Sequence, residues 1–108
     1  MTAIAVMTTT PSADEAHAIA SSLVERKLAA CVHIVPIESV YSWEGEVQND
    51  SEYRLLAKTT EARYADVEAA ILELHSYDLP AVVAFHIAGG YTPYLDWVAA
   101  NAPGEALS

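Results

Sequence analysis

The sequence predicts an α+β domain in which two helices cover one face of an antiparallel sheet. Segments with the spacing of strands and helices follow in the order strand, helix, strand, strand, helix, strand. The two middle strands are joined by a short turn, which is typical of a hairpin. The length of 108 residues suits one compact domain, which we take to span residues 1–108.

The first strand and helix are indicated by an apolar run and a capping signal. Residues Ala3–Met7 are a short apolar run that ends in a turn at Pro11. Ser12 and Glu15 have the spacing of a capping box, which marks the start of a helix. The buried stripe of that helix is predicted from the residues that recur at helical spacing, which are Ala16, Ile19, Ala20, Leu23, Val24 and Leu28.

The hairpin consists of two long runs, residues 30–43 and 47–60. The first run is rich in β-branched and aromatic residues, and Pro36 favours an edge strand or a bulge because proline donates no ladder hydrogen bond. The side chains of the second run alternate between apolar and polar, as expected for a strand with one buried face. We expect one face to carry Tyr53, Leu55 and Ala57, and the other Glu52, Arg54 and Lys58.

The last third of the chain predicts a helix, a strand and a short final helix. The second helix has a stripe formed by Tyr64, Val67, Ile71 and Leu74. A loop over residues 75–80 leads to an apolar strand over residues 81–87, and Thr92 as N-cap before Pro93 starts a helix that reaches Asn101. The first six elements form the split βαβ arrangement, a ferredoxin-like sandwich.

Composition narrows the classes of partner. Fifteen acidic and five basic side chains give a formal net charge of −10, so we expect neither nucleic acid nor a membrane surface as a partner. We find no apolar segment long enough to span a bilayer and no secretory signal. Cys31 is the single cysteine, so an internal disulfide is excluded. We therefore expect a cytoplasmic protein.

The hairpin is long for a domain of this size. A strand of a dozen residues spans roughly 40 Å, whereas a compact domain of this length has a radius of gyration of about 13 Å. The outer half of the hairpin would carry Tyr41 and Trp43 beyond the core, and exposed apolar strand edges are usually covered. We expect a second copy of the chain to cover them, with the turn 42–47 acting in assembly.

Five segments carry a resemblance to one known family: ERKLAACVHIVP (25–36), YSWEGEV (41–47), EYRLLAKTT (52–60), HSYDLPAVVAF (75–85) and YLDWV (94–98). In this order and at this spacing they resemble the CutA divalent-cation tolerance proteins. The resemblance implies a tight homotrimer, similar in architecture to the PII signalling proteins, with hairpins exchanged between subunits. It also implies weak binding of copper or another divalent cation and a part in the response to metal ions.

The sequence departs from the family at three site positions. Members regarded as copper binders have a cysteine after the first strand and a His-His pair in the last loop. Here Thr8 occupies the cysteine position and Leu74 the first histidine position, which leaves His75. Ala81 stands where the family usually has glutamate. The residues that do match, and that the resemblance makes candidates for a ligand cleft, are Lys58, Tyr77, Trp97 and Glu44 beside Trp43.

Cys31 and His33 are the other candidate metal ligands. They lie two residues apart on one strand, so both side chains point to the same face. Thiolate and imidazole are ligands that copper accepts. The alternative for Cys31 is a small buried hydrophobic residue. His86, at the opposite edge of the predicted sheet, could approach this pair only across a subunit interface, and a solvated helix face explains His17.

Lys58 has two interpretations, an ion pair with Glu52 or a neighbouring subunit, or the binding of an anion. No catalytic arrangement of side chains is recognisable, so we expect no enzymatic activity. Two functions stay open at this point. One is a trimeric metal-tolerance protein that binds copper weakly, and the other is a PII-like signalling or scaffold trimer that binds a small ligand or an unidentified partner between subunits.

Overall fold

The computed structural model describes residues 2–103, which form four strands, three α-helices and one short 3-10 helix. In chain order these are β1 (Ala3–Thr10), α1 (Ala13–Glu25), β2 (Cys31–Trp43), β3 (Glu46–Thr60), η1 (Glu61–Arg63), α2 (Tyr64–Leu74), β4 (Val82–His86) and α3 (Thr92–Asn101). None of the helices in this range has the length and apolar character that crossing a membrane requires.

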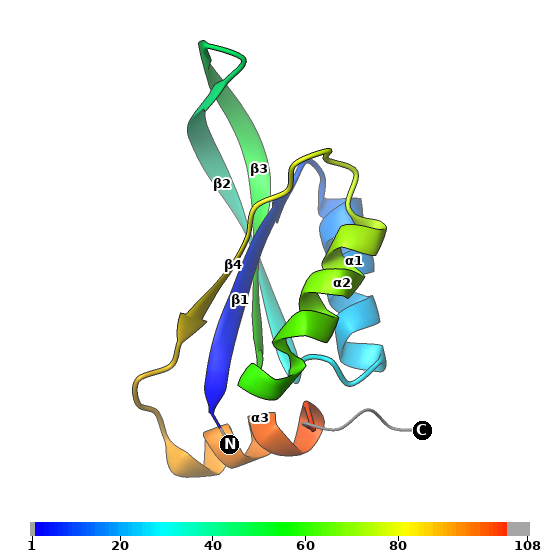
Figure 1. Cartoon of the computed structure of the whole chain (residues 1–108), viewed down its shortest axis with the longest axis vertical. Helices are drawn as coiled ribbons and strands as arrows, with labels where there is room; N and C mark the ends of the chain where they lie inside the picture. Colours follow the sequence, from blue (N-terminus) through cyan, green and yellow to red (C-terminus); the bar gives the residue numbers. More distant parts are fainter. Residues whose placement is uncertain (1, 104–108) are drawn as a thin grey trace.

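The four strands form one antiparallel sheet in the order β2-β3-β1-β4. Helices α1 and α2 lie together on one face of this sheet, and α3 lies at its end, near the N-terminus (Figure 1). The predicted ferredoxin-like α+β fold is confirmed, with β2 and β4 at opposite edges. Pro36 therefore lies in an edge strand, and the pairing of β2 with β3 contains no bulge.

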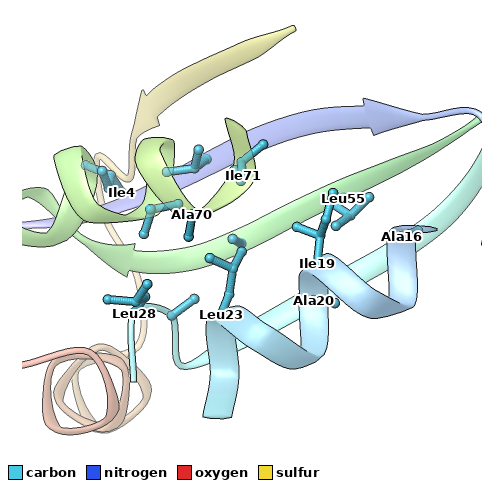
Figure 2. Close-up of a cluster of buried hydrophobic side chains, with 13 residues drawn as sticks. Ile4, Ala16, Ile19, Ala20, Leu23, Leu28, Leu55, Ala70 and Ile71 are labelled. Atoms are coloured by element: carbon cyan, nitrogen blue, oxygen red, sulfur yellow. The ribbon is translucent and has the colours of Figure 1, made fainter. Parts of the chain in front are cut away.

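The core lies between the sheet and the two helices (Figure 2). Its largest fully buried side chains include Val6, Ile19, Leu23, Leu55 and Ile71. The helical spacing predicted the stripe on α1 with one error, since Val24 is exposed. Leu28 is buried as expected, but it lies beyond the helix end.

A left-handed residue ends α1. Lys27 has a φ of 57°, and the Leu28 amide donates to the Leu23 carbonyl at 2.9 Å. A residue in this conformation just after a helix is a common way to satisfy the last carbonyls. The turn brings Leu28 back over the core, which explains why its position fits the helical spacing although it is not helical.

The β2–β3 hairpin extends well beyond the rest of the sheet (Figure 1). Strand β1 reaches only to Thr10, which faces Tyr53, whereas β2 and β3 stay paired from Cys31–Lys58 to Trp43–Glu46. Residues 37–52 thus form a two-stranded extension, which we call the arm. The molecule measures 44 Å along its longest axis, as the sequence estimate of an overlong hairpin anticipated.

The arm reverses at a two-residue turn. Glu44 and Gly45 have φ values of 51° and 80°. Positive φ at both central residues is characteristic of a type I′ turn, whose twist matches that of the paired strands. Glycine adopts this conformation at no steric cost, whereas Glu44 adopts it as a non-glycine residue.

The other face of the sheet is not covered by helices within the chain. Strand register places Met7, Leu56, Val83 and Phe85 on this face, opposite the buried positions. Phe85 is 53% exposed there, and Val83 is exposed as well. We call this surface the open sheet face. Met7, Leu56, Val83 and Phe85 form an apolar patch on it that is continuous across three strands, and Arg54 and Lys58 flank this patch on β3.

Candidate functional site

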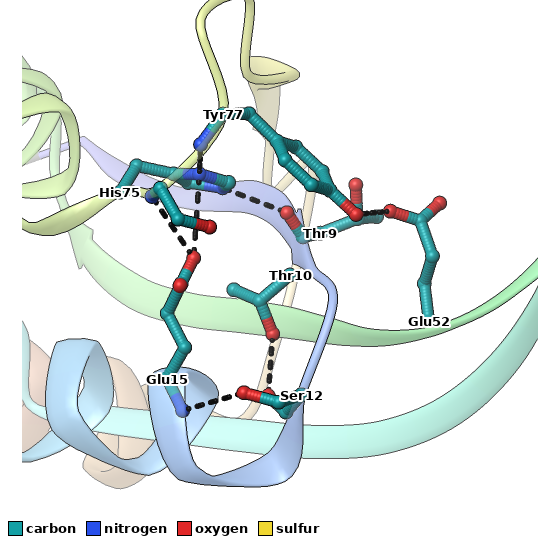
Figure 3. Close-up of polar contacts among 8 residues, drawn as sticks. Thr9, Thr10, Ser12, Glu15, Glu52, His75 and Tyr77 are labelled. Atoms are coloured by element: carbon teal, nitrogen blue, oxygen red, sulfur yellow. Dashed lines mark hydrogen bonds and ion pairs between the residues drawn. The ribbon is translucent and has the colours of Figure 1, made fainter.

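His75 ties the loop after α2 to the sheet. Its Nε2 lies 2.7 Å from the carbonyl oxygen of Thr9, and since a carbonyl only accepts, Nε2 carries the proton. The amide of Tyr77 donates to Nδ1 at 3.1 Å. These two contacts define a neutral imidazole with both nitrogens engaged (Figure 3).

Glu15 holds the same loop from α1. Its Oε2 accepts a hydrogen bond from the Ser76 amide at 3.2 Å and lies 3.4 Å from His75 Nδ1. Ser12 accepts from the Glu15 amide at 3.1 Å, which fixes the first helical turn. Half of the predicted capping box is therefore present, while the Glu15 side chain turns to the loop.

This geometry argues against the predicted role of His75 as a metal ligand. Its side chain is 1% exposed, and neither ring nitrogen has a free lone pair. Cys31 is in register with Lys58, which faces Ala5, four residues along β1 from Thr9. That separation is about 13 Å along the strand, so His75 and Cys31 do not share a site.

Tyr77, which His75 positions, reaches a buried carboxylate. The Tyr77 hydroxyl donates to Glu52 Oε2 at 2.7 Å, and Glu52 is only 8% exposed. Burial, followed by this hydrogen bond and the charge of Glu52, raises the pKa of Tyr77. Higher on the arm, the Tyr41 hydroxyl is bonded to Asp50, and that hydrogen bond raises the pKa of Tyr41.

A groove of about 870 Å³ separates the arm from the loop after α2. The described residues that line it provide three carboxylates, three aromatic rings and several hydroxyl groups, but no lysine, arginine or histidine. The charged, aromatic and aliphatic side chains of the lining include Glu38, Val40, Tyr41, Trp43, Glu52, Tyr77, Asp78 and Leu79. The groove has the size of pockets that bind small molecules.

Alkaline pH should reveal the Tyr77–Glu52 contact. The folded chain holds the Tyr77 proton above the ordinary tyrosine pKa of about 10, whereas the unfolded chain releases it near that value. The unfolded state therefore binds fewer protons above this pH, and the contribution to stability, complete below it, declines as pH rises. Urea unfolding across this range should show a shallower decline for Tyr77→Phe. Equal slopes would contradict the assignment.

Cys31, His33 and Lys58 form a second group, on the open sheet face. Cys31 pairs with Lys58 in the strand register, and Lys58 Nζ lies 3.2 Å from His33 Nδ1. Because an ammonium only donates, Nδ1 is the acceptor, and the ring proton of His33 is on Nε2. The predicted ion pair of Lys58 with Glu52 is absent within the chain, since Glu52 lies six residues away along β3.

The four cleft candidates are not brought together within one chain. Tyr77 lines the groove, whereas Glu44 lies in the turn of the arm and Lys58 contacts His33. Trp97 stacks on Tyr94 in α3, with ring centroids 5.7 Å apart. Trp43 and Tyr41, expected to act in assembly, line the groove and remain exposed.

Sequence reasoning missed Glu52 and Asp50 as partners of tyrosine hydroxyls. Alternation along β3 put Glu52 on the polar face, and the cover that Tyr77 provides could not be seen from the strand alone. One feature of the sequence could have indicated Glu52. It is the first residue of the segment EYRLLAKTT, at the point where β3 passes from the arm into the domain. Within residues 2–103, no three His, Cys, Asp or Glu side chains are grouped closely enough to hold a metal ion.

Comparison with known proteins places the chain in a family. The family model described as CutA1 divalent ion tolerance protein matches residues 4–101. The Divalent-cation tolerance protein CutA of Thermus thermophilus is 46% identical over 97 residues, which are 89% of this chain and 94% of that protein. The chloroplastic Protein CutA of Arabidopsis thaliana is also 46% identical, and the matched region spans 88% of this chain but only 53% of that protein.

A solved structure agrees with the fold. The periplasmic divalent cation tolerance protein CutA from Archaeoglobus fulgidus superposes with a TM-score of 0.91 at 37% identity, covering 93% of this chain and 98% of that one. The sequence comparison and the structural comparison therefore identify the same family. The chain belongs to the CutA1 divalent ion tolerance family.

Proposed function

We propose that this divalent-cation tolerance protein acts as a homotrimer without catalysis and binds a soft divalent cation such as copper weakly. The observation that carries the metal proposal is the Cys31–His33 pair beside Lys58 on the open sheet face. The names of the relatives support a link to divalent cations, and the chemistry of the donors supports copper.

The open sheet face supports assembly. Soluble monomers rarely expose continuous apolar surface of this kind, and here it lies beside an arm with exposed aromatic residues. In the trimer, a neighbouring copy covers Leu56, Val83 and Phe85. Tyr41 and Trp43 on the arm extend toward that neighbour, as expected from the length of the hairpin.

The donor set fits copper, but incompletely. Cys31 and His33 are two residues apart on one strand, so their Cα atoms are about 7 Å apart and their side chains are parallel. The Cys31 thiolate and Nδ1 of His33, released from Lys58, provide two ligands, and the remaining positions fall to solvent or to a second copy. Two ligands from one strand explain why we expect weak binding.

Copper titration tests this assignment. We expect Cys31→Ser and His33→Gln each to weaken copper binding about tenfold or more, since each removes one of two ligands. His75→Gln is the control, because its ring nitrogens are engaged in the fold, and it should change affinity less than about threefold. Retained binding in Cys31→Ser and His33→Gln, with loss in His75→Gln, would overturn the proposal.

A second function is favoured by the groove between the arm and the loop after α2. Its volume of about 870 Å³ and its mixed polar and apolar lining suit a small ligand. In this case the chain is a PII-like signalling or scaffold trimer, and the binding of a ligand changes the conformation of the groove. Copper binding at Cys31 and ligand binding in the groove can be measured separately.

A further inference from the structure

We propose that His75 is a pH-sensitive switch that connects the loop after α2 to the base of the arm. When the ring takes up a proton from water, Nδ1 exchanges the Tyr77 amide for the Glu15 carboxylate, and Tyr77 then releases Glu52. The switch needs neither copper nor a ligand in the groove. The His75 side chain is 1% exposed within the single chain, so its burial does not depend on a neighbouring copy.

Two groups compete for Nδ1 of His75 (Figure 3). The Tyr77 amide donates to it at 3.1 Å, and Glu15 Oε2 lies 3.4 Å from it. An unprotonated Nδ1 is an acceptor and suits the amide, whereas a protonated Nδ1 is a donor and suits the carboxylate. Because the amide and the carboxylate make opposite demands on the same atom, the charge of the ring determines which of them is bonded.

The other ring nitrogen keeps the same partner in both charge states. Nε2 carries a proton in the neutral and in the charged ring, so it can donate to the Thr9 carbonyl, 2.7 Å away, in either case. Thr9 lies one residue beyond the last pair of β1 with β4, which joins Thr8 to Val82. The ring therefore stays anchored to β1 while Nδ1 changes partner.

The charged groups around the ring favour this exchange. Glu15 contacts the ring from α1, and Glu52 of β3 lies beyond the Tyr77 ring. Arg54, in register with Thr9, points to the open sheet face. The ion pairs within residues 2–103 leave Glu15 without a lysine or arginine partner. A buried imidazolium is costly unless a charge opposes it, and Glu15 supplies that charge.

Protonation of the ring displaces Tyr77. The Tyr77 amide then faces an N–H group at Nδ1, and two donors cannot bond to each other. The Tyr77 ring also packs on the His75 ring, with centroids 4.9 Å apart, so amide and ring move together. The Tyr77 hydroxyl is the donor to Glu52 Oε2, at the point where β3 leaves the arm. A proton on His75 therefore loosens the contact that holds the base of the arm to the loop.

Nuclear magnetic resonance of the full chain from about pH 8 to 5, the range in which histidine changes charge, tests the switch. The ring nitrogen signals that His75→Gln removes belong to His75, and they distinguish the neutral ring from the imidazolium. Hydrogen exchange of the Tyr77 amide, corrected for the intrinsic effect of pH on exchange, reports its bond to Nδ1. We expect the protection of this amide to fall about tenfold as the ring is protonated, which corresponds to the loss of one hydrogen bond.

Four variants separate the steps. Glu15→Gln keeps the imidazole but removes its counter-charge, so the transition should move to lower pH. Asp14→Asn is the matched control, because it removes the same charge from the adjacent, exposed position of α1, and it should leave the transition in place. His75→Gln cannot change charge, so Tyr77 protection should not depend on pH. The carboxyl signal of Glu52 should follow His75 in the unchanged chain, but not in Tyr77→Phe, which lacks the hydroxyl.

A protonated His75 ring beside a Tyr77 amide that keeps its protection would overturn the proposal, and so would a ring that stays neutral down to about pH 5. The same loss of protection in His75→Gln would show that another group drives it. Equal displacement of the transition by Glu15→Gln and Asp14→Asn would indicate overall charge rather than the contact at Nδ1. If the Tyr77 amide responds while Glu52 does not, the connection to the arm is wrong.

Discussion

Replacing Leu55 by alanine is expected to lower the free energy of unfolding by about 2 to 5 kcal/mol, the usual cost of truncating a fully buried leucine. Leu55 is 1% exposed on the central strand β3, between Thr8 of β1 and Ile34 of β2, and it faces the helices. Chemical denaturation at a fixed protein concentration measures the effect. The variant should keep the proposed trimeric state wherever it is folded.

The neighbouring residue provides the control. Leu56 points to the open sheet face, so Leu56→Ala removes contacts between copies rather than contacts within the core. Its effect should appear as dissociation at low protein concentration, because stability that depends on association varies with concentration. If both variants lost the same stability at every concentration, the open sheet face would not be an interface.

Placing a charge on the open sheet face should have the largest effect on assembly. We expect Phe85→Glu to abolish the proposed trimer, since three copies of a carboxylate would be buried without partners in an apolar contact. Phe85 is exposed in the single chain, so the change causes no clash within it. Analytical ultracentrifugation at micromolar concentration should show a monomer, and circular dichroism should show that the fold is retained.

Leu72→Glu is the control for this substitution. Leu72 is 51% exposed, nearly as much as Phe85 at 53%, but it lies on α2, which covers the opposite face of the sheet. It should leave the trimer intact. A trimeric Phe85→Glu, or dissociation by Leu72→Glu, would place the interface elsewhere.

The fold could be predicted from the sequence because each helix and strand has its own spacing of apolar residues. The stripe of α1, the alternation of β3 and the edge position of Pro36 are properties of single segments, and the strand order follows from connecting them. Errors occurred where a tertiary contact overrides the local pattern. Leu28 keeps the helical spacing but is brought to the core by the turn at Lys27.

The site was less predictable because its contacts join distant segments. His75 bonds to Thr9, and Tyr77 bonds to Glu52, across long stretches of chain. A histidine in a polar loop has the same sequence appearance whether it is free or engaged at both nitrogens. Only the packing of the loop against β1 and α1 reveals that both ring nitrogens of His75 have partners.

The turn at Glu44–Gly45 determines more than the end of the arm. One ladder of paired residues runs from this turn to Cys31 and Lys58, so an insertion of a single residue that shifted the pairing would invert the side chains along it. Tyr41 would leave the groove and His33 would leave the open sheet face in one step. Insertions that add one residue to each strand, by contrast, lengthen the arm and preserve every pair below them. Arm length can therefore vary among related chains in paired steps, while the two surfaces that the arm connects remain unchanged.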